Sequence, residues 1–317
     1  MCSKGPNEEN YEFFENIEEY IKKAKSAETT NASSNAVTKC KSFMVAYGSR
    51  FKAEETARTI CEHFINLYNS LNEPKCNLNS DPKNKKCCKF LKYWVNSKLS
   101  KSMKNETQCV HSIYNGLESQ ITGPDGFIID LEFKDDINKD DLNKMNILYR
   151  LHKIYTDING ILENDSEDVK KTLSSLSTAC CTDYLVANYM CNGGNGDDSN
   201  NSQFCIQLKK FKTTYEKLYN TVDGKGPEYS KNFIKLTQCN NNIMSTALIG
   251  TTVGLVPLLV GLYKFTPIRQ FINSKKGKLT QEYRNNDDEM TNAMLMDQQS
   301  EYIGSQQGTY NIKYHSV

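Results

Sequence analysis

An uncharged apolar run, Ile243–Tyr263, constrains this chain more than any other sequence feature. As a helix, the run would be about 31 Å long, which matches the hydrocarbon thickness of a lipid bilayer. A helix buried in a soluble core seldom extends so far without a polar face. Pro257 lies inside the run, and membrane helices tolerate proline better than soluble helices do. We therefore expect residues 243–263 to form one transmembrane helix in contact with lipid.

Two glycines in this run, Gly250 and Gly254, have the GxxxG spacing. That spacing lets two membrane helices approach closely, so it makes a helix–helix dimer through the membrane segment possible. Glycine is also common in membrane helices in general, and this simpler explanation is favoured. The two glycines remain candidates for packing between membrane helices.

Basic residues flank the apolar run unequally. Lys231 and Lys235 precede it, whereas a larger basic group follows it within a similar distance, namely Lys264, Arg269, Lys275, Lys276 and Lys278. The positive-inside rule then places the C-terminal side in the cytosol. The predicted organisation is an ectodomain over residues 1–242, a membrane helix over 243–263 and a cytoplasmic tail over 264–317. The tail is polar and is expected to be disordered.

The first 30 residues do not have the pattern of a cleavable signal peptide. Their longest strictly apolar run is Phe13-Phe14, and seven glutamates occur among them. A signal peptide needs a longer apolar segment. The sequence therefore predicts export by an internal signal or by an unusual route.

The twelve cysteines all precede the apolar run, and residues 243–317 contain none. This segregation favours disulfide bonds outside the cytosol. Adjacent cysteines are expected to have different partners, and the connectivity stays open. No CxxC pair occurs, so no metal site is predicted. The candidates for disulfide bonding are Cys40, Cys61, Cys76, Cys87, Cys88, Cys109, Cys180, Cys181, Cys191, Cys205 and Cys239.

Apolar residues recur at steps of three and four through most of the first 242 residues, which indicates amphipathic helices. Pro74 and the polar stretch 77–86 predict a loop. The fold class is therefore all-α, a multi-helix ectodomain stapled by disulfides. The predicted helices are 8–25, 53–71, 88–99, 106–119, 138–163, 167–190 and 204–218.

Two side chains on predicted apolar faces are candidates for more than packing. Trp94 is interpreted as a core anchor, with stacking on a ligand as the less favoured alternative. His152 is interpreted as a hydrogen-bonded core residue rather than a catalyst. We predict no catalytic residue at either position.

Charge and motifs exclude several classes of function. Lys and Arg total 39 against 38 Asp and Glu, for a net charge of +1, which excludes a globally basic nucleic-acid binder. The sequence contains no HExxH, no GxSxG, no phosphate-binding loop and no dinucleotide fingerprint. We therefore expect a protein that is not an enzyme, binds no nucleic acid and carries no cofactor.

Several stretches resemble the Plasmodium interspersed repeat family of malaria parasites, in particular its vivax-type variant interspersed repeat (Vir) members. Three of them lie on predicted helices, at Cys88–Leu99, Leu148–Tyr155 and Phe204–Tyr215. The most specific are Tyr263-Lys-Phe-Thr-Pro267, after the apolar run, and the closing Tyr310–Val317. The resemblance covers about residues 35–317.

The resemblance implies a non-enzymatic variant antigen of a large multigene family. Such proteins are associated with immune evasion and with contacts to host receptors or antibodies, on the infected cell surface or in exported host-cell membranes. An intracellular trafficking or scaffold protein is the alternative. The chain departs from the family in its higher cysteine count, and it lacks the pentameric host-export motif; Arg58–Glu62 imitates that motif only loosely.

Overall fold

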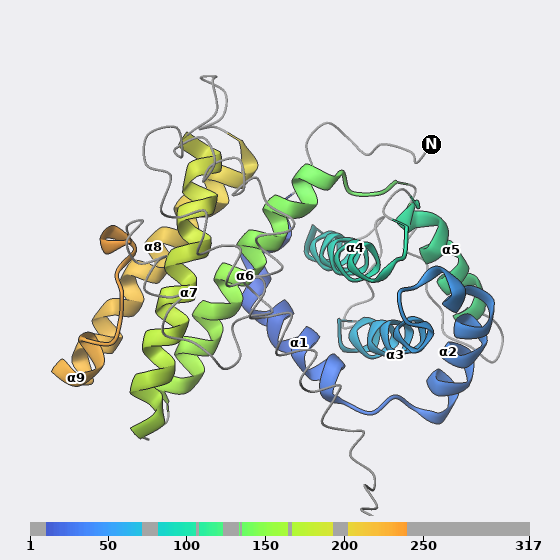
Figure 1. The fold of residues 1–317 in the computed structure, drawn as a ribbon, viewed down its shortest axis with the longest axis horizontal. Helices are drawn as coiled ribbons and strands as arrows, with labels where there is room; N and C mark the ends of the chain where they lie inside the picture. The colour runs from blue at the N-terminus through green and yellow to red at the C-terminus, as the bar shows by residue number, and fades with distance from the viewer. Residues whose placement is uncertain are drawn as a thin grey trace, which may run out of the picture. The chain divides into compact units, whose positions relative to one another are not determined.

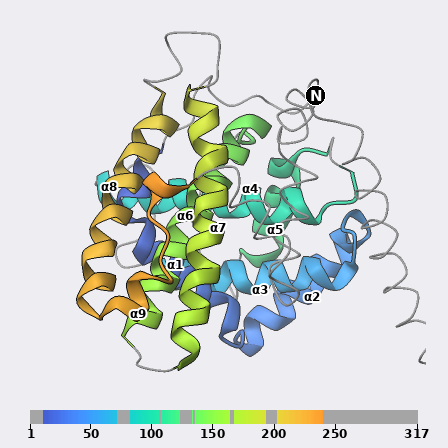
Figure 2. The ribbon, with the colours of Figure 1, turned by 60° about the vertical axis from the view of Figure 1, so that its left-hand side comes forward.

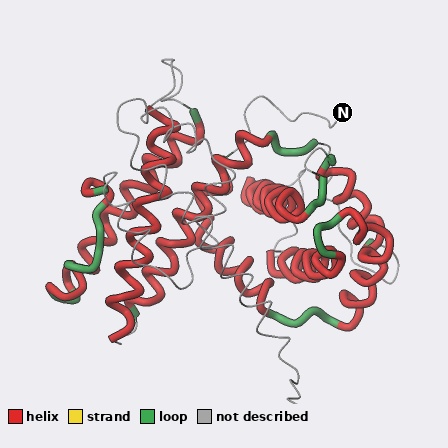
Figure 3. The backbone as a smooth tube through the Cα atoms, viewed as in Figure 1, coloured by secondary structure: helices red, strands yellow, loops and turns green. Residues whose placement is uncertain are grey.

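The described part of the protein is helical. The computed structural model describes residues 11–71, 82–105, 108–122, 133, 135–163, 167–192 and 202–239. Within these ranges no strand occurs. Phe51 and Met103 form an isolated antiparallel bridge, and Thr122 and Asp136 also stand in bridge positions (Figure 3). The predicted all-α, disulfide-containing fold is confirmed for this part of the chain.

The helices fall into an N-terminal and a C-terminal set along the chain (Figure 1). Helices α2, α3 and α5 pack on one another, and α6, α7 and α8 do likewise. The first set is η1 (Glu12–Asn16), α1 (Ile17–Thr29), α2 (Ser34–Tyr47), η2 (Gly48–Arg50), α3 (Glu54–Leu71), α4 (Pro82–Ser102) and α5 (Val110–Ile121). The second set is α6 (Lys139–Leu162), α7 (Glu167–Asn192), α8 (Gln203–Gly224), α9 (Pro227–Ser230) and η4 (Leu236–Gln238).

Side-chain caps fix where several helices begin. The Ser33 hydroxyl accepts a hydrogen bond from the Ala36 amide at 3.2 Å at the start of α2. Asn138 caps α6 in the same way through the Asp141 amide, at 2.9 Å. Such caps satisfy backbone donors that have no partner within the helix.

Two boundaries differ from the sequence prediction. The predicted helix 8–25 divides into the 3₁₀ helix η1 and the α-helix α1, which continues to Thr29. The predicted loop 77–86 is wrong at its end, because α4 already begins at Pro82. Proline is well placed there, since the first turn of a helix needs no amide donor from it.

Aromatic side chains join η1, α1, α4 and α6. The Phe13 ring lies 5.9 Å from Phe90 and 5.4 Å from Tyr93, measured between centroids. Tyr20 of α1 stacks on Phe90 at 4.7 Å, and Tyr149 of α6 lies 5.6 Å from Tyr93. Trp94 of α4, next to Tyr93 in the sequence, also lies in the core, with 3% of its surface exposed. Through these rings, η1 packs on α4, and α4 packs in turn on α6.

The segment 227–239, which we call the strap, runs along α7 and α8 (Figure 2, orange). A disulfide between Cys181 of α7 and Cys239 closes it. The Tyr215 hydroxyl donates to the Ile234 carbonyl at 3.2 Å, and the Phe233 ring stacks on Tyr215 at 5.0 Å. The strap is therefore fixed both covalently and by packing.

Disulfides form at most of the described cysteines. Cys40 of α2 bonds to Cys61 of α3, and Cys191 of α7 bonds to Cys205 of α8. Cys87 and Cys109 are disulfide-bonded as well. Cys76 lies outside the described residues.

The prediction of disulfide bonding is wrong for Cys88 and Cys180, which are free, buried thiols. Each stands next to a bonded cysteine, Cys87 or Cys181. Consecutive residues on an α-helix point about 100° apart. When one cysteine of an adjacent pair faces its disulfide partner, the other therefore faces a different direction. Cys88 and Cys180 are directed into the core in this way.

The described residues all lie in one of the two units into which the chain divides, Met1–Val253. The predicted membrane helix 243–263, with Gly250 and Gly254, lies outside the described residues, as does the predicted tail. Among the residues that are described, no helix has the length and apolarity to cross a bilayer.

Candidate functional site

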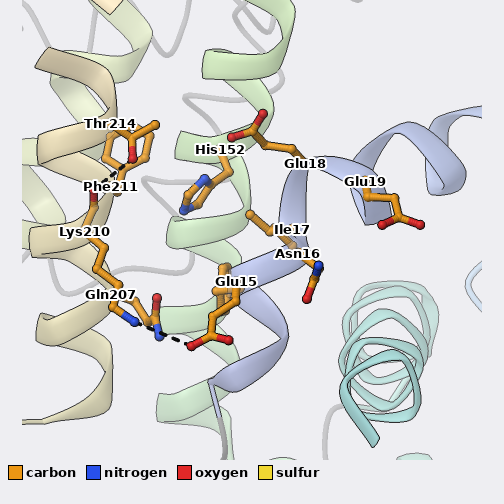
Figure 4. A pocket seen from close by; sticks show the side chains of 11 residues that line it. Glu15, Asn16, Ile17, Glu18, Glu19, His152, Gln207, Lys210, Phe211 and Thr214 are labelled. Carbon is orange, nitrogen blue, oxygen red and sulfur yellow. Dashed lines mark hydrogen bonds and ion pairs between the residues drawn. The ribbon is translucent and has the colours of Figure 1, made fainter. Parts of the chain in front are cut away.

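A cavity of about 390 Å³ opens between η1 and α1 on one side and α6 and α8 on the other. Figure 4 shows its lining, to which η1 contributes Glu15, α6 contributes His152 and α8 contributes Gln207 and Phe211. Its volume lies within the range of small-molecule sites. The cavity combines an apolar floor, buried polar groups and a charged rim.

The floor is aromatic and aliphatic. Phe14, Ile17 and Phe211 line the cavity and are almost fully buried. The His152 ring meets Phe211 edge-on at 5.0 Å and lies 5.9 Å from Phe14, measured between centroids. These rings hold the imidazole in place from two sides.

The His152 imidazole is buried and incompletely satisfied. The residue is 8% exposed, and Nδ1 has no hydrogen-bond partner among the described residues. Burial lowers the pKa of His152 to about 4, since a charged ring would be poorly solvated there. The ring is therefore neutral at pH 7. The sequence prediction of a buried residue agrees with this position, but the hydrogen bond that the prediction assumed is missing at Nδ1.

Gln207 is a second buried polar group in the same cavity. It is 5% exposed and lines the cavity together with His152. A buried polar atom without a partner costs about 1–3 kcal/mol. Among the atoms that line this cavity, the His152 Nδ1 is such an atom, and packing alone does not explain it.

Carboxylates surround the opening. Glu15 pairs with Lys86 at 2.5 Å and with Lys210 at 3.8 Å. The hydrogen bond from Lys86, and then its charge, hold the pKa of Glu15 below its usual value. Glu19 pairs with Lys23 at 2.9 Å. Glu18 lines the cavity without an ion-pair partner among the described residues.

The buried imidazole predicts a stability loss in acid. The unfolded chain protonates His152 near pH 6.5, whereas the folded chain does so only near pH 4. The unfolded state thus binds more protons in this window, so stability that is present above pH 6.5 is lost as the pH falls towards 4. Between pH 7 and 4.5, we expect the native chain to lose about 2–3 kcal/mol more than His152→Phe does. Urea unfolding at both pH values measures this difference.

His63→Phe serves as the matched control. His63 is only partly buried, and although burial also lowers its pKa, Glu28 and Glu62 act in the opposite direction. We expect a smaller effect on the pH dependence from this variant. If His152→Phe and the native chain lose equal stability in acid, the neutral buried imidazole is refuted.

A second cluster, Cys109, His111 and Asp136, has the geometry of a metal site but different chemistry. The potential ligand atoms of these residues lie within 4.8 Å of one another. Cys109 is disulfide-bonded, so it offers no thiolate. Asp136 accepts hydrogen bonds from the amides of Val110 and His111, at 2.9 and 2.5 Å, and thereby caps α5. The cluster is a helix cap, and we assign no metal to it.

Comparison with known families identifies one match. The family model described as Plasmodium vivax Vir protein matches residues 227–317. This match supports membership in the Vir family. No curated protein and no solved structure matches the chain.

The Vir match begins at α9 and covers the strap, the predicted membrane helix and the tail. It includes the two most specific stretches of resemblance, Tyr263–Pro267 and Tyr310–Val317. The three earlier stretches lie outside it. Vir proteins are variant antigens and are not known as enzymes, so the match suggests a Plasmodium variant antigen.

Few of the sequence candidates lie in the cavity. His152 lines it, whereas Trp94 and the bonded cysteines do not. Sequence reasoning missed Gln207 and Glu18. A signal for Gln207 was present, because it occurs in phase with Phe204 and Phe211 on the apolar face of α8. A polar residue within an apolar stripe indicates either a buried hydrogen bond or a ligand contact.

Proposed function

We propose that this Vir chain is a non-enzymatic variant antigen, anchored in a membrane by residues 243–263. In this proposal, the helical region faces outward, where it meets host receptors or antibodies and contributes to immune evasion, and residues 264–317 face the cytosol. The family match over residues 227–317 carries the proposal. The infected host-cell surface and exported host-cell membranes are the proposed locations.

The disulfides support an ectodomain outside the cytosol. Eight described cysteines are disulfide-bonded, and two are free. Such a proportion is typical of proteins from oxidising compartments and rare in the cytosol. An intracellular scaffold, the alternative, would keep most of these thiols reduced. The cysteines therefore favour the surface antigen.

The asymmetric basic residues support the same orientation. Lys264, Arg269 and Lys275 follow the apolar run closely, and basic residues near a membrane helix stay on the cytosolic side. This argument uses charge alone and does not depend on the disulfides. Two independent features thus favour one topology.

Protease treatment of intact infected cells tests the topology. One antibody is raised against the folded helical region and another against residues 285–317. We expect protease to remove the first signal and to leave a membrane-bound fragment that the second antibody detects. The physical reason is that the bilayer shields only the residues on its inner side.

Permeabilised cells provide the control, since protease should then remove both signals. Protection of both signals in intact cells would contradict the surface location. Loss of the tail signal with retention of the helical region would contradict the orientation.

A further inference from the structure

The cavity between η1, α1, α6 and α8 contains hydrogen-bonding capacity that the described residues do not use. His152 and Gln207 are both more than nine-tenths buried. In the described part of the chain, the Nδ1 atom of His152 has no hydrogen-bond partner, and Gln207 lines the same cavity. In Figure 4, the His152 ring points into the space between η1 and α8. Native proteins rarely leave such groups unsatisfied, so a ligand is the natural partner.

The charges at the rim indicate the sign of that ligand. Glu15, Glu18 and Glu19 line the cavity together with a single lysine, Lys210. Glu15 and Glu19 already have lysine partners, so Glu18 is the carboxylate left to pair with an incoming cation. Among the described residues, Lys210 pairs with Glu15, at 3.8 Å.

The floor indicates the rest of the ligand. Phe14, Ile17 and Phe211 present apolar surface and two aromatic rings. Aromatic faces attract cations, and apolar walls favour an aliphatic or aromatic body. An ammonium group carries only donors, whereas the unprotonated nitrogen of a neutral imidazole and an amide oxygen are acceptors. Donors on the ligand therefore match the acceptors in the cavity.

We propose that this cavity binds a small organic amine in its ammonium form, with an apolar body. The apolar body packs on Phe14, Ile17 and Phe211. The ammonium group pairs with Glu18 and donates hydrogen bonds to His152 or Gln207. This site lies outside the residues of the family match, and the proposal does not depend on the membrane topology.

Three probes of similar shape and different charge test the proposal on the full chain in detergent. They are 2-phenylethylamine, 2-phenylethanol and 3-phenylpropionate. The chain has four histidines, so its imidazole NMR signals are few. The signal that disappears in His152→Phe assigns His152. We expect the amine to shift this signal and to bind about tenfold more tightly than the alcohol or the acid.

Two surface variants change the rim without altering the core. Glu18→Gln removes the available carboxylate, and we expect amine affinity to fall about three- to fivefold. Lys210→Met removes the nearby positive charge, and we expect amine affinity to rise by a similar factor. Glu55→Gln is the matched control, because this exposed glutamate lies on α3, away from the cavity. It should leave the affinity unchanged.

Several results would overturn the assignment. Tighter binding of 3-phenylpropionate, strengthened by Glu18→Gln, would make the site an anion site. Equal binding of all three probes would show that the charge of the ligand does not contribute to its affinity. If none of the probes shifts the His152 signal, the cavity is not a site for this class of ligand. None of these results bears on protease accessibility, so failure here and failure of the proposed antigen function can be told apart.

Discussion

Replacing Arg150 by methionine is expected to destabilise the fold by about 3–5 kcal/mol, because it leaves a buried carboxylate without its partner. Arg150 of α6 donates to both oxygens of Asp183 on α7, from Nε and Nη2, each at 2.9 Å. Asp183 is 3% exposed, so water cannot replace the lost donors. Urea unfolding followed by far-UV circular dichroism measures the loss.

The double variant Arg150→Met/Asp183→Leu separates the unpaired charge from lost packing. Replacing both partners of a buried ion pair by apolar residues is often nearly neutral. We therefore expect the second substitution to restore most of the stability that the first removes. If the double variant is as unstable as Arg150→Met, lost packing rather than the buried charge explains the effect.

Arg150→Lys adds a test of geometry. Lysine keeps the positive charge but cannot form the parallel pair of hydrogen bonds that a guanidinium forms. We expect a stability between those of the native chain and Arg150→Met. The contact is notable in a chain with only five arginines, since lysine dominates its basic residues.

The long helices could be predicted from sequence because their buried residues recur in phase. In α3, Ala57, Ile60, Phe64 and Leu71 are all buried, which is the pattern that the sequence shows. Helix α2 (Ser34–Tyr47) was not predicted, because few of its residues are buried. It buries only Ala36, Cys40 and Phe43, while Val45 is 82% exposed. Because its apolar stripe is so narrow, hydrophobic periodicity does not reveal this helix. The cap at Ser33 and the disulfide from Cys40 to α3 help to stabilise it.

The 3₁₀ helix η1 shows where local pattern fails. Phe13 and Phe14 are adjacent, and both are buried. The α-helices of this fold also bury adjacent residues, such as Phe64 and Ile65 of α3, so two neighbouring aromatic residues do not by themselves predict a 3₁₀ helix. Contacts of Phe13 with Phe90 and of Phe14 with His152 determine the local backbone instead. Such contacts join distant parts of the chain, so the sequence pattern does not contain them.

The candidate cavity was only partly predictable for the same reason. His152 stood out because it interrupts an apolar face on α6, and Gln207 does the same on α8. Each interruption can be read from the sequence, but their convergence depends on how α6 packs against α8. The disulfide partners share this limit, because cysteine spacing leaves many pairings open.

Removing the Cys181–Cys239 disulfide with alanines is expected to lower stability by about 4 kcal/mol. The bond closes a loop of 58 residues, and longer loops lose more entropy when they are closed in the unfolded chain. Urea unfolding without reductant measures the global effect. Hydrogen exchange of the strap, residues 227–239, measures the local one, and we expect exchange there to accelerate.

The matched control is Cys191→Ala/Cys205→Ala, which removes the disulfide between α7 and α8. That disulfide closes a loop of only 14 residues. We expect it to cost about 3 kcal/mol and to leave strap exchange unchanged relative to global unfolding. The strap keeps noncovalent contacts in both variants, through the Tyr215 hydroxyl and the Phe233 ring. If these contacts alone held it, strap exchange would be the same in the two variants. Faster exchange confined to Cys181→Ala/Cys239→Ala would instead show that the disulfide keeps the end of the helical region on α7, next to the segment predicted to enter the membrane.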